Sequence, residues 1–338
     1  MGRDNAVSVE VKLFDSVNEA ALDAAGALDR PAQQSLYDRL DWFALVAEHC
    51  PLPGRPIVAR ARHGHDQAWM FLALADAKAS AWASWYSLRW RPIGDPDLFR
   101  HILAALRDRR ISALDLAPLE QTEPLVRACE ESGWIAFVEP AKANWRAFTQ
   151  GMDFDAYWAG RPGKLRSTAK RKAKAAGLEI EIFDHFDQAG WAEYEAVYEA
   201  SWKPGEGSPA FLRALAEQEG RAGTLRLGVA RKDGVAVAAQ LWLIENEEAT
   251  IHKLAYREDA KALSPGTVLS MAMFRRALDE DRVGLIDYGT GDEPYKADWM
   301  DERRTLWRLR AYNRGTLRGL AGAARRAASS LVGRTLSR

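Results

Sequence analysis

Cysteine is nearly absent from this sequence, since Cys50 and Cys129 are the only two among 338 residues. Two cysteines cannot form a disulfide framework, and neither they nor the six scattered histidines have zinc-site spacing. We therefore expect no metal and a reducing cytoplasmic environment. The sequence also has no apolar run of about 18 residues and no basic-then-apolar leader, which predicts that the chain is neither membrane-spanning nor exported.

Acidic residues are missing from the C-terminal end of the chain. Residues 303–338 contain ten arginines and no acid, whereas residues 1–150 and 151–302 have net charges of −3 and −7. A second basic segment, Arg161–Lys174, contains seven basic residues and no acid. Such an uneven distribution of charge gives information about the binding partners of a protein rather than about its fold.

Periodicity in the second half predicts alternating strands and helices. The expected strands are 178–183, 225–231, 235–244, 249–256, 283–287 and 308–313, and the expected helices are 189–201, 209–219 and 266–279. A short helix is expected between the last two strands. This order resembles that of the GNAT fold, an α/β fold with a mixed, mostly antiparallel central sheet flanked by helices.

The first half shows a weaker version of the same order. Its expected strands are 56–62, 68–75, 81–90 and 111–116, and its expected helix is 98–109. A shift of roughly 171 residues aligns Arg60 with Arg231 and Asp115 with Asp287, which predicts a tandem duplication. We expect a degenerate GNAT-like domain at 1–150, a catalytic GNAT domain at 151–313 and a basic tail at 314–338.

The segment Ser264-Pro265-Gly266-Thr267 is the candidate cofactor site. It follows an expected strand and begins a helix, where free backbone N–H groups and the helix dipole favour an anion such as a pyrophosphate. An ordinary Pro/Thr helix start is the structural alternative. The first half has Asp95 and Asp97 at the corresponding place, and their carboxylates would repel a phosphate.

The candidate catalytic residues follow the expected strand 283–287, in a glycine-rich loop. Acyl transfer to an amine or hydroxyl needs a base for the acceptor and an acid for the leaving thiolate. Asp287 or Asp292 is the candidate base, Tyr295 is the candidate acid, and Lys296 is placed to hold an anionic substrate. The structural alternative is that Asp287 caps the loop and Tyr295 packs.

Two further places carry candidate substrate-binding residues. Trp202 and Lys203 lie between the first two helices of the second half and are candidates for stacking on a sugar ring and pairing with an anion. His252 and Lys253 lie on the strand before the candidate cofactor segment, and alternation directs them to opposite faces. A Trp that fills the gap between helices and a His within the sheet are the structural alternatives.

The two basic segments predict contacts with anions. Arg161–Lys174 reads as a helix that could bind phosphates of a nucleotide-linked acceptor, of RNA or of a lipid, or could simply be solvated. The tail suits a helix lying on an anionic inner membrane surface, although its glycines weaken it as a helix and favour fraying as the alternative. Its apolar face is formed by Leu317, Leu320, Ala324, Ala328 and Leu331.

Several motifs together resemble the GNAT-related acetyltransferase domain of bacterial polysaccharide and cellulose biosynthesis proteins, which is related to FemAB-like transferases with tandem GNAT domains. They are YEASWK, the hairpin KDG, HKLAYREDAKALSPGT and DYGTGDEPYKADW, all within residues 160–313. The candidate cofactor segment departs from the commoner GNAT pattern, which has Gln or Arg followed by two spaced glycines.

The resemblance implies an N-acyltransferase, with acetyl-coenzyme A as the donor and an envelope or exopolysaccharide precursor as the acceptor. Neither cysteine lies in a candidate motif, which favours direct transfer without a thiol intermediate. Two alternatives remain open. One is a FemAB-like aminoacyl transferase that uses charged tRNA, and the other is a non-catalytic scaffold of an envelope polysaccharide synthesis complex.

Overall fold

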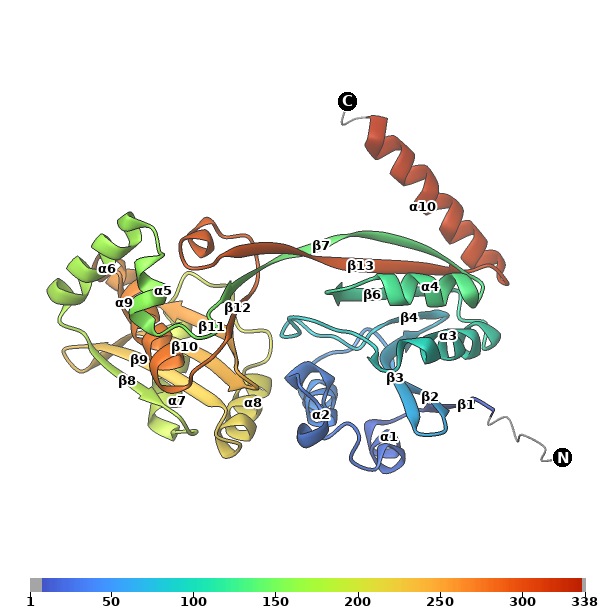
Figure 1. Cartoon of the computed structure of the whole chain (residues 1–338), viewed down its shortest axis with the longest axis horizontal. Helices are drawn as coiled ribbons and strands as arrows, with labels where there is room; N and C mark the ends of the chain where they lie inside the picture. The colour runs from blue at the N-terminus through green and yellow to red at the C-terminus, as the bar shows by residue number, and fades with distance from the viewer. Residues whose placement is uncertain (1–7, 336–338) are drawn as a thin grey trace. The chain divides into compact units, whose positions relative to one another are not determined.

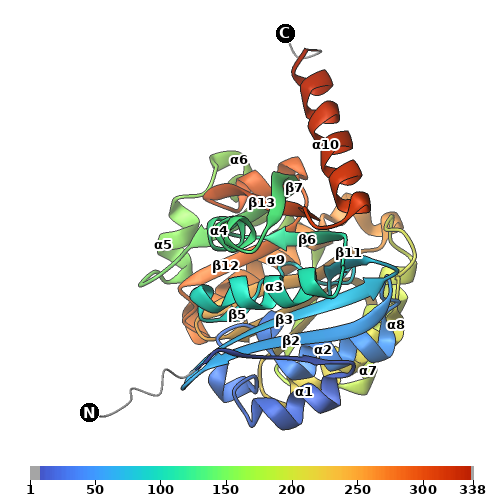
Figure 2. The same ribbon diagram turned by 90° about the vertical axis from the view of Figure 1, so that its right-hand side faces the viewer.

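The computed structural model of the chain describes residues 8–335, with side chains described up to Ser329 (Figures 1 and 2). The chain forms two compact units. Unit 1 comprises Met1–Lys142 and Thr305–Arg338, and unit 2 comprises Ala143–Arg304. The unit boundaries fall within two long strands, β7 (Trp134–Phe148) and β13 (Glu302–Asn313).

Unit 1 is a mixed, mostly antiparallel sheet with the strand order β1-β2-β3-β4-β6-β13. Its only parallel pair among the described residues is β4 with β6. Helices flank this sheet (Figure 2). The strands are β1 (Glu10–Phe14), β2 (Arg55–His63), β3 (Asp66–Ala75), β4 (Lys78–Ala81), β5 (Ile93–Gly94) and β6 (Ala113–Leu119), and the helices are α1 (Val17–Ala24), α2 (Leu40–His49), α3 (Phe99–Asp108), α4 (Glu123–Glu131) and α10 (Leu317–Thr335).

Unit 2 repeats this topology with the order β8-β9-β10-β11-β12-β7, in which β11 and β12 are the parallel pair. The strands are β8 (Glu179–Phe183), β9 (Leu225–Lys232), β10 (Val235–Glu245), β11 (Glu248–Tyr256) and β12 (Leu285–Thr290), and the helices are α5 (Phe154–Ala159), α6 (Gly163–Ala176), α7 (Gln188–Glu199), α8 (Pro209–Arg221) and α9 (Pro265–Arg275). Its core packs Trp242, Phe274 and Trp299 with aliphatic side chains of the sheet and α9.

A buried arginine links the first strand, second strand and first helix of unit 1. Arg60 on β2 is fully buried and forms ion pairs with Glu10 of β1 and Asp23 of α1. Because a buried charge is costly unless it is paired, these contacts fix the three elements together.

The same arrangement occurs in unit 2. Arg231 on β9 contacts Glu181 of β8 at 2.8 Å and Glu193 of α7 at 2.5 Å. The aligned residues Asp115 and Asp287 likewise both lie on the fifth strand of their sheets, β6 and β12. The two units therefore share one architecture in which equivalent elements carry equivalent side chains.

The strand expected at 81–90 is wrong beyond Ala81, because β4 ends there and the chain continues irregularly. Ser84 and Ser87 form a local turn, with the Ser84 N–H donating to the Ser87 hydroxyl at 3.0 Å. Such side-chain contacts compete with sheet pairing. The aromatic residues that suggested a strand are nevertheless buried, since Trp82, Tyr86 and Trp90 all pack into the core.

Candidate functional site

The segment expected to hold the cofactor begins α9 in unit 2. Ser264 has left-handed backbone geometry (φ 54°), and its carbonyl accepts the N–H groups of Thr267 at 3.1 Å and Val268 at 3.2 Å. Gly266 lies against the ring of Tyr256, and a Cβ at this position would be 3.2 Å from that ring. The helix thus starts beside an aromatic side chain of the preceding strand, β11.

The basic segment forms α6, which contacts both α9 and the loop before it. The Lys172 ammonium donates to the carbonyl of Ala262 at 2.6 Å, two residues before Ser264. Five other basic residues of α6 are exposed and have no ion pair within the described residues. They are Lys164, Arg166, Lys170, Arg171 and Lys174.

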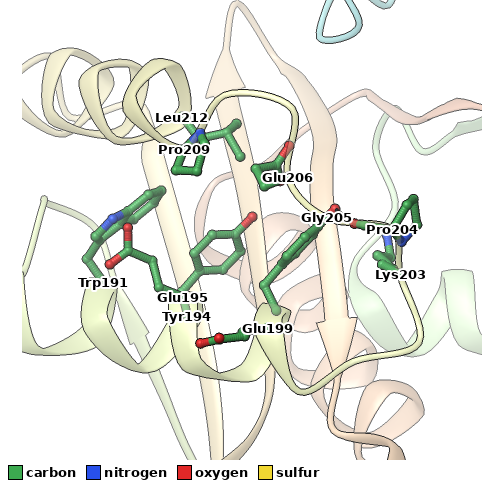
Figure 3. A pocket seen from close by; sticks show the side chains of 11 residues that line it. Trp191, Tyr194, Glu195, Glu199, Lys203, Pro204, Gly205, Glu206, Pro209 and Leu212 are labelled. Atoms are coloured by element: carbon green, nitrogen blue, oxygen red, sulfur yellow. Dashed lines mark hydrogen bonds between the residues drawn. The ribbon is translucent and has the colours of Figure 1, made fainter.

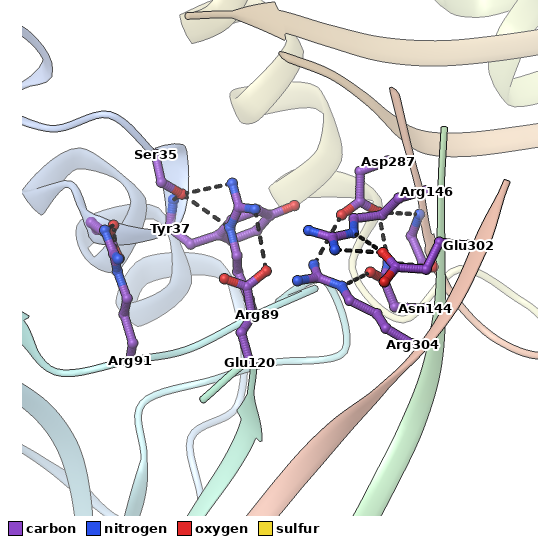
Figure 4. Close-up of polar contacts among 12 residues, drawn as sticks. Ser35, Tyr37, Arg89, Arg91, Glu120, Asn144, Arg146, Asp287, Glu302 and Arg304 are labelled. Carbon is purple, nitrogen blue, oxygen red and sulfur yellow. Dashed lines mark hydrogen bonds and ion pairs between the residues drawn. The ribbon is translucent and has the colours of Figure 1, made fainter. Parts of the chain in front are cut away.

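Asp287 is buried at the middle of β12 and its carboxylate is held by several donors (Figure 4). One oxygen accepts the Asn144 amide and the Gly289 N–H, both at 2.7 Å, and the other lies 3.5 Å from the Arg304 guanidinium. Arg304 also donates to the Asn144 side chain at 2.5 Å. The carboxylate thus joins β12 to the adjoining parts of β7 and β13.

Asp292 lies apart from this network, in the loop after β12. It forms a two-point ion pair with Arg303, at 2.8 and 2.6 Å. The hydrogen bond from Arg303 is the main cause that lowers the pKa of Asp292. Asp287 and Asp292, the two carboxylates that the sequence offers as a base, therefore each contact an arginine. Such contacts suit residues that hold the loop in position.

Tyr295 and Lys296 lie in the short helix Pro294–Asp298 that follows β12. The Tyr295 ring meets the buried Tyr288 edge-to-face at 5.9 Å between centroids, and burial, with Glu293 nearby, raises the pKa of Tyr295 to about 12. Lys296 is buried, donates to the Thr290 carbonyl at 2.8 Å and pairs with Glu293 at 3.0 Å.

Trp202 and Lys203 follow α7 and link this part of unit 2 to β11 and the start of α9. The Trp202 ring packs on Tyr256 at 4.2 Å between centroids, and the Lys203 ammonium lies 5.9 Å from the Trp202 ring. Burial, followed by repulsion from Lys253, lowers the pKa of Lys203 to about 8, and Glu293 opposes this shift. Contacts therefore run from Lys203 through Trp202 and Tyr256 to the start of α9.

Lys253 and His252 are neighbours on β11, but a bulge in the pairing with β10 leaves His252 without a cross-strand partner, so the strict alternation expected from the sequence is interrupted there. Lys253 pairs with Glu206 at 2.9 Å, and both side chains are only 10% exposed. His252 is buried, and this burial lowers its pKa to about 3, so the imidazole is neutral at physiological pH.

A pocket of about 370 Å³ lies beside Lys203, between α7, the loop that follows it and the start of α8 (Figure 3). Its aromatic wall consists of Trp191, Tyr194 and Tyr198, at helical spacing along α7. Glu195 and Glu199 of the same helix are exposed at the pocket and have no ion pair within the described residues. Its other lining residues are Lys203, Pro204, Gly205, Glu206, Pro209 and Leu212.

Comparison with known proteins places this site in a known fold. Residues 161–297 match the family model of the acetyltransferase (GNAT) domain. A tandem GNAT protein from the clavulanic acid biosynthesis pathway is 13% identical, with 89% of this chain and 98% of that chain covered and a TM-score of 0.50. The chain has a tandem GNAT fold.

Two other solved structures share this fold. FemX is 10% identical, with 90% of this chain and 97% of that chain covered and a TM-score of 0.57. The C-terminal domain of a putative lysylphosphatidylglycerol synthetase from Agrobacterium fabrum is 18% identical, with 90% and 95% covered and a TM-score of 0.54. No curated protein matches the chain in sequence. Within the described residues, no group of His, Cys, Asp and Glu side chains could hold a metal ion.

Sequence reasoning missed several residues of this candidate site. Asn144 and Arg304 lie 143 and 17 positions from Asp287, and no local pattern relates the three. The sequence also gives no sign that Glu206 pairs with Lys253, since the two residues lie 47 positions apart. The pocket residues of α7 did carry a signal, since Trp191, Tyr194 and Tyr198 recur at helical spacing, but the same spacing is typical of a core-facing helix.

We predict that Lys253→Met raises the pKa of Lys203 toward its ordinary value. The substitution removes the repelling ammonium and frees Glu206 to attract the remaining one. The measurement is an NMR titration of lysines labelled by reductive ¹³C-methylation. Lys164→Met on α6 is the matched control, and it should leave the signal unchanged. An unshifted Lys203 signal in Lys253→Met would contradict the proximity of the two ammonium groups.

Proposed function

We propose that unit 2 is an N-acyltransferase that moves an acyl group, in the first place acetyl, from acyl-coenzyme A to an amine. The observation that carries this proposal is the pocket beside Lys203. Its carboxylates Glu195 and Glu199 and its aromatic wall suit a protonated amine, which both kinds of side chain attract. The resemblance to polysaccharide biosynthesis proteins supports an envelope or exopolysaccharide precursor as the acceptor.

The donor is proposed to bind at the start of α9. Gly266 keeps this helix end free of a side chain, and Ser264 and Thr267 add hydroxyls beside it. The N–H groups and dipole of a helix N-terminus attract a pyrophosphate. In unit 1, the corresponding position is taken by Asp95, whose carboxylate accepts the Asp97 N–H at 3.0 Å. That difference supports assigning the donor to unit 2.

In the proposed reaction, the amine nitrogen attacks the thioester carbonyl carbon, the carbon–sulfur bond breaks, and the departing thiolate takes a proton. Tyr295 is proposed as the proton donor, because it lies in the short helix directly after β12 and carries a protonated hydroxyl at neutral pH. Glu199, a pocket carboxylate without an ion pair in the described part of the chain, is proposed to accept the proton that the acceptor ammonium loses before attack, and the second nitrogen proton, released as the amide forms, restores the Tyr295 hydroxyl. Asp287 and Asp292 then hold the loop in place through their arginines. Lys203 would contact an anionic group of a substrate, whereas Lys296, which is buried against the Thr290 carbonyl and Glu293, would hold the loop.

A second candidate is an aminoacyl transferase that uses charged tRNA. The exposed basic residues of α6, without carboxylate partners and next to the loop before α9, favour it. Such a surface attracts phosphates without reading sequence. The fold shared with FemX is compatible with this candidate and with the first.

We expect calorimetric titration of the purified protein to show binding of acetyl-coenzyme A in the micromolar range. The affinity should change little between about 50 and 200 mM salt, a range over which nucleic-acid binding weakens steeply. Uncharged tRNA is titrated in parallel. The variant Lys170→Ala/Arg171→Ala/Lys174→Ala should keep the affinity for acetyl-coenzyme A within about threefold, since these side chains lie outside the start of α9.

Two results would overturn the acyl-coenzyme A assignment. One is the absence of acetyl-coenzyme A binding together with tight, steeply salt-dependent tRNA binding that the triple variant loses, which would favour the aminoacyl transferase. The other is the absence of detectable binding of both acetyl-coenzyme A and tRNA, which would favour a non-catalytic scaffold. With donor binding established, a panel of amino sugars then tests the acceptor by the release of free thiol.

A further inference from the structure

Among its described side chains, the C-terminal helix α10 packs against unit 1 through one side. Gly322 lies on the Tyr312 ring of β13, where a Cβ would come within 2.6 Å, and Ala323 is buried. Arg326 forms an ion pair with Glu139 of β7. Glycine therefore has a packing role here, since it lets the helix approach the strand. These contacts hold α10 as an ordered helix that extends from its sheet (Figure 1).

The other side of α10 exposes apolar side chains. Leu317 is 87% exposed and Leu320 is 45% exposed. Ala321, Ala324 and Ala328 are also exposed and continue the same face along the helix, because residues three, four or seven positions apart lie on one side. The side chain of Leu331, which the sequence adds to this face, lies outside the described residues.

Positive charge accompanies this apolar face. Arg314, Arg318 and Arg325 are exposed, and no acidic residue occurs from 303 to the end of the sequence. A second copy of the helix would bring arginines against arginines, which disfavours pairing between two copies through this face. A nucleic acid would neutralise the arginines but would leave the leucines without an apolar environment. An anionic lipid surface satisfies both, since it accepts apolar side chains and attracts cations.

We propose that α10 is an interfacial helix that binds the protein to an anionic bilayer surface, with Leu317 and Leu320 inserted between lipids and the arginines at the headgroups. The helix would lie in the plane of the surface. Within the described residues, no helix has the length and apolar character to cross a membrane. This proposal rests on α10 alone and is independent of the acyl transfer proposed for unit 2.

The test is flotation of the full-length protein with vesicles of phosphatidylcholine, with or without about one third phosphatidylglycerol. We expect the protein to float with the anionic vesicles and to remain in solution with the neutral ones. Raising the salt should weaken binding, because screening reduces attraction between the arginines and the surface. Leu317→Asp/Leu320→Asp should reduce the bound fraction at limiting lipid by about tenfold or more.

The matched control is Leu22→Asp, since Leu22 is an equally exposed leucine (86%) on α1 of unit 1. This variant should bind vesicles like the unsubstituted protein. Circular dichroism and melting temperature establish that all variants remain folded. Flotation that Leu317→Asp/Leu320→Asp leaves unchanged, an equal loss in Leu22→Asp, or no flotation of the unsubstituted protein would each overturn the proposal.

Discussion

Replacement of Asp287 with alanine is expected to lower the free energy of unfolding by about 3–5 kcal/mol. The carboxylate is 4% exposed and holds Asn144, the Gly289 N–H and Arg304. Removing it takes a carboxylate contact from Arg304 and an acceptor from the Gly289 N–H and the Asn144 amide, and a buried polar group that loses an acceptor adds a desolvation cost. Urea denaturation measures the change.

The control for this prediction is Asp292→Ala. Asp292 also pairs with an arginine, but this ion pair with Arg303 is exposed and screened by solvent, so its loss should cost far less than the loss of Asp287. Equal losses in the two variants would contradict the distinction between a buried and an exposed carboxylate.

Asp287→Asn keeps the shape of the side chain and removes the charge. We expect acyl transfer to survive in Asp287→Asn, because Asp287 is assigned a positioning role; its abolition in a folded variant would instead favour Asp287 as the base, since an amide cannot accept a proton at neutral pH.

Most strands and helices of unit 2 were predictable from periodicity alone. Expected and observed limits of β9, β10, β11 and α8 differ by two residues or fewer. Each of these elements buries one face or is buried throughout, so its sequence carries the period of its structure. The tandem fold was predictable for the same reason, since both halves carry this pattern.

Other features had no local signal. The strand β7 was missed because its burial alternates weakly along 15 residues and its partners lie more than 130 positions later in the chain. The segment after β4 was misread because Trp82, Tyr86 and Trp90 are buried without being in a strand. In both cases tertiary contacts determine the conformation, and they are absent from a window of a dozen residues.

The candidate site also has residues that local sequence could predict and contacts that it could not. Gly266, Tyr295 and Lys203 were found because each lies in a loop or helix start whose composition differs from its surroundings. The sequence could not show that Lys253 pairs with Glu206, or that Trp202 packs on Tyr256, since these contacts join different elements. Those contacts are what bring the separate motifs into one site.

Gly266→Asp is expected to weaken acetyl-coenzyme A binding by about a hundredfold or more. A carboxylate about 5 Å from a phosphate repels it by roughly 3 kcal/mol at an effective dielectric constant near 20, which corresponds to that factor. The substitution gives unit 2 the kind of carboxylate that Asp95 provides in unit 1. An acidic residue in the first turn of a helix is favourable, so the melting temperature should not fall below that of Gly266→Ala, which places the same Cβ against the Tyr256 ring. Calorimetric titration and thermal unfolding measure the two effects.

Gly266→Ala separates charge from bulk in this experiment. Its methyl group meets the Tyr256 ring at 3.2 Å, so the ring must move by a few tenths of an ångström. We expect this variant to lose only a few-fold in affinity, because it leaves the N–H groups and the helix dipole unchanged. Equal losses in the two variants would mean that the Tyr256 ring, rather than charge at the helix start, determines binding. Unchanged affinity in Gly266→Asp would remove the start of α9 from the donor site, and the search would then move to the basic surface of α6.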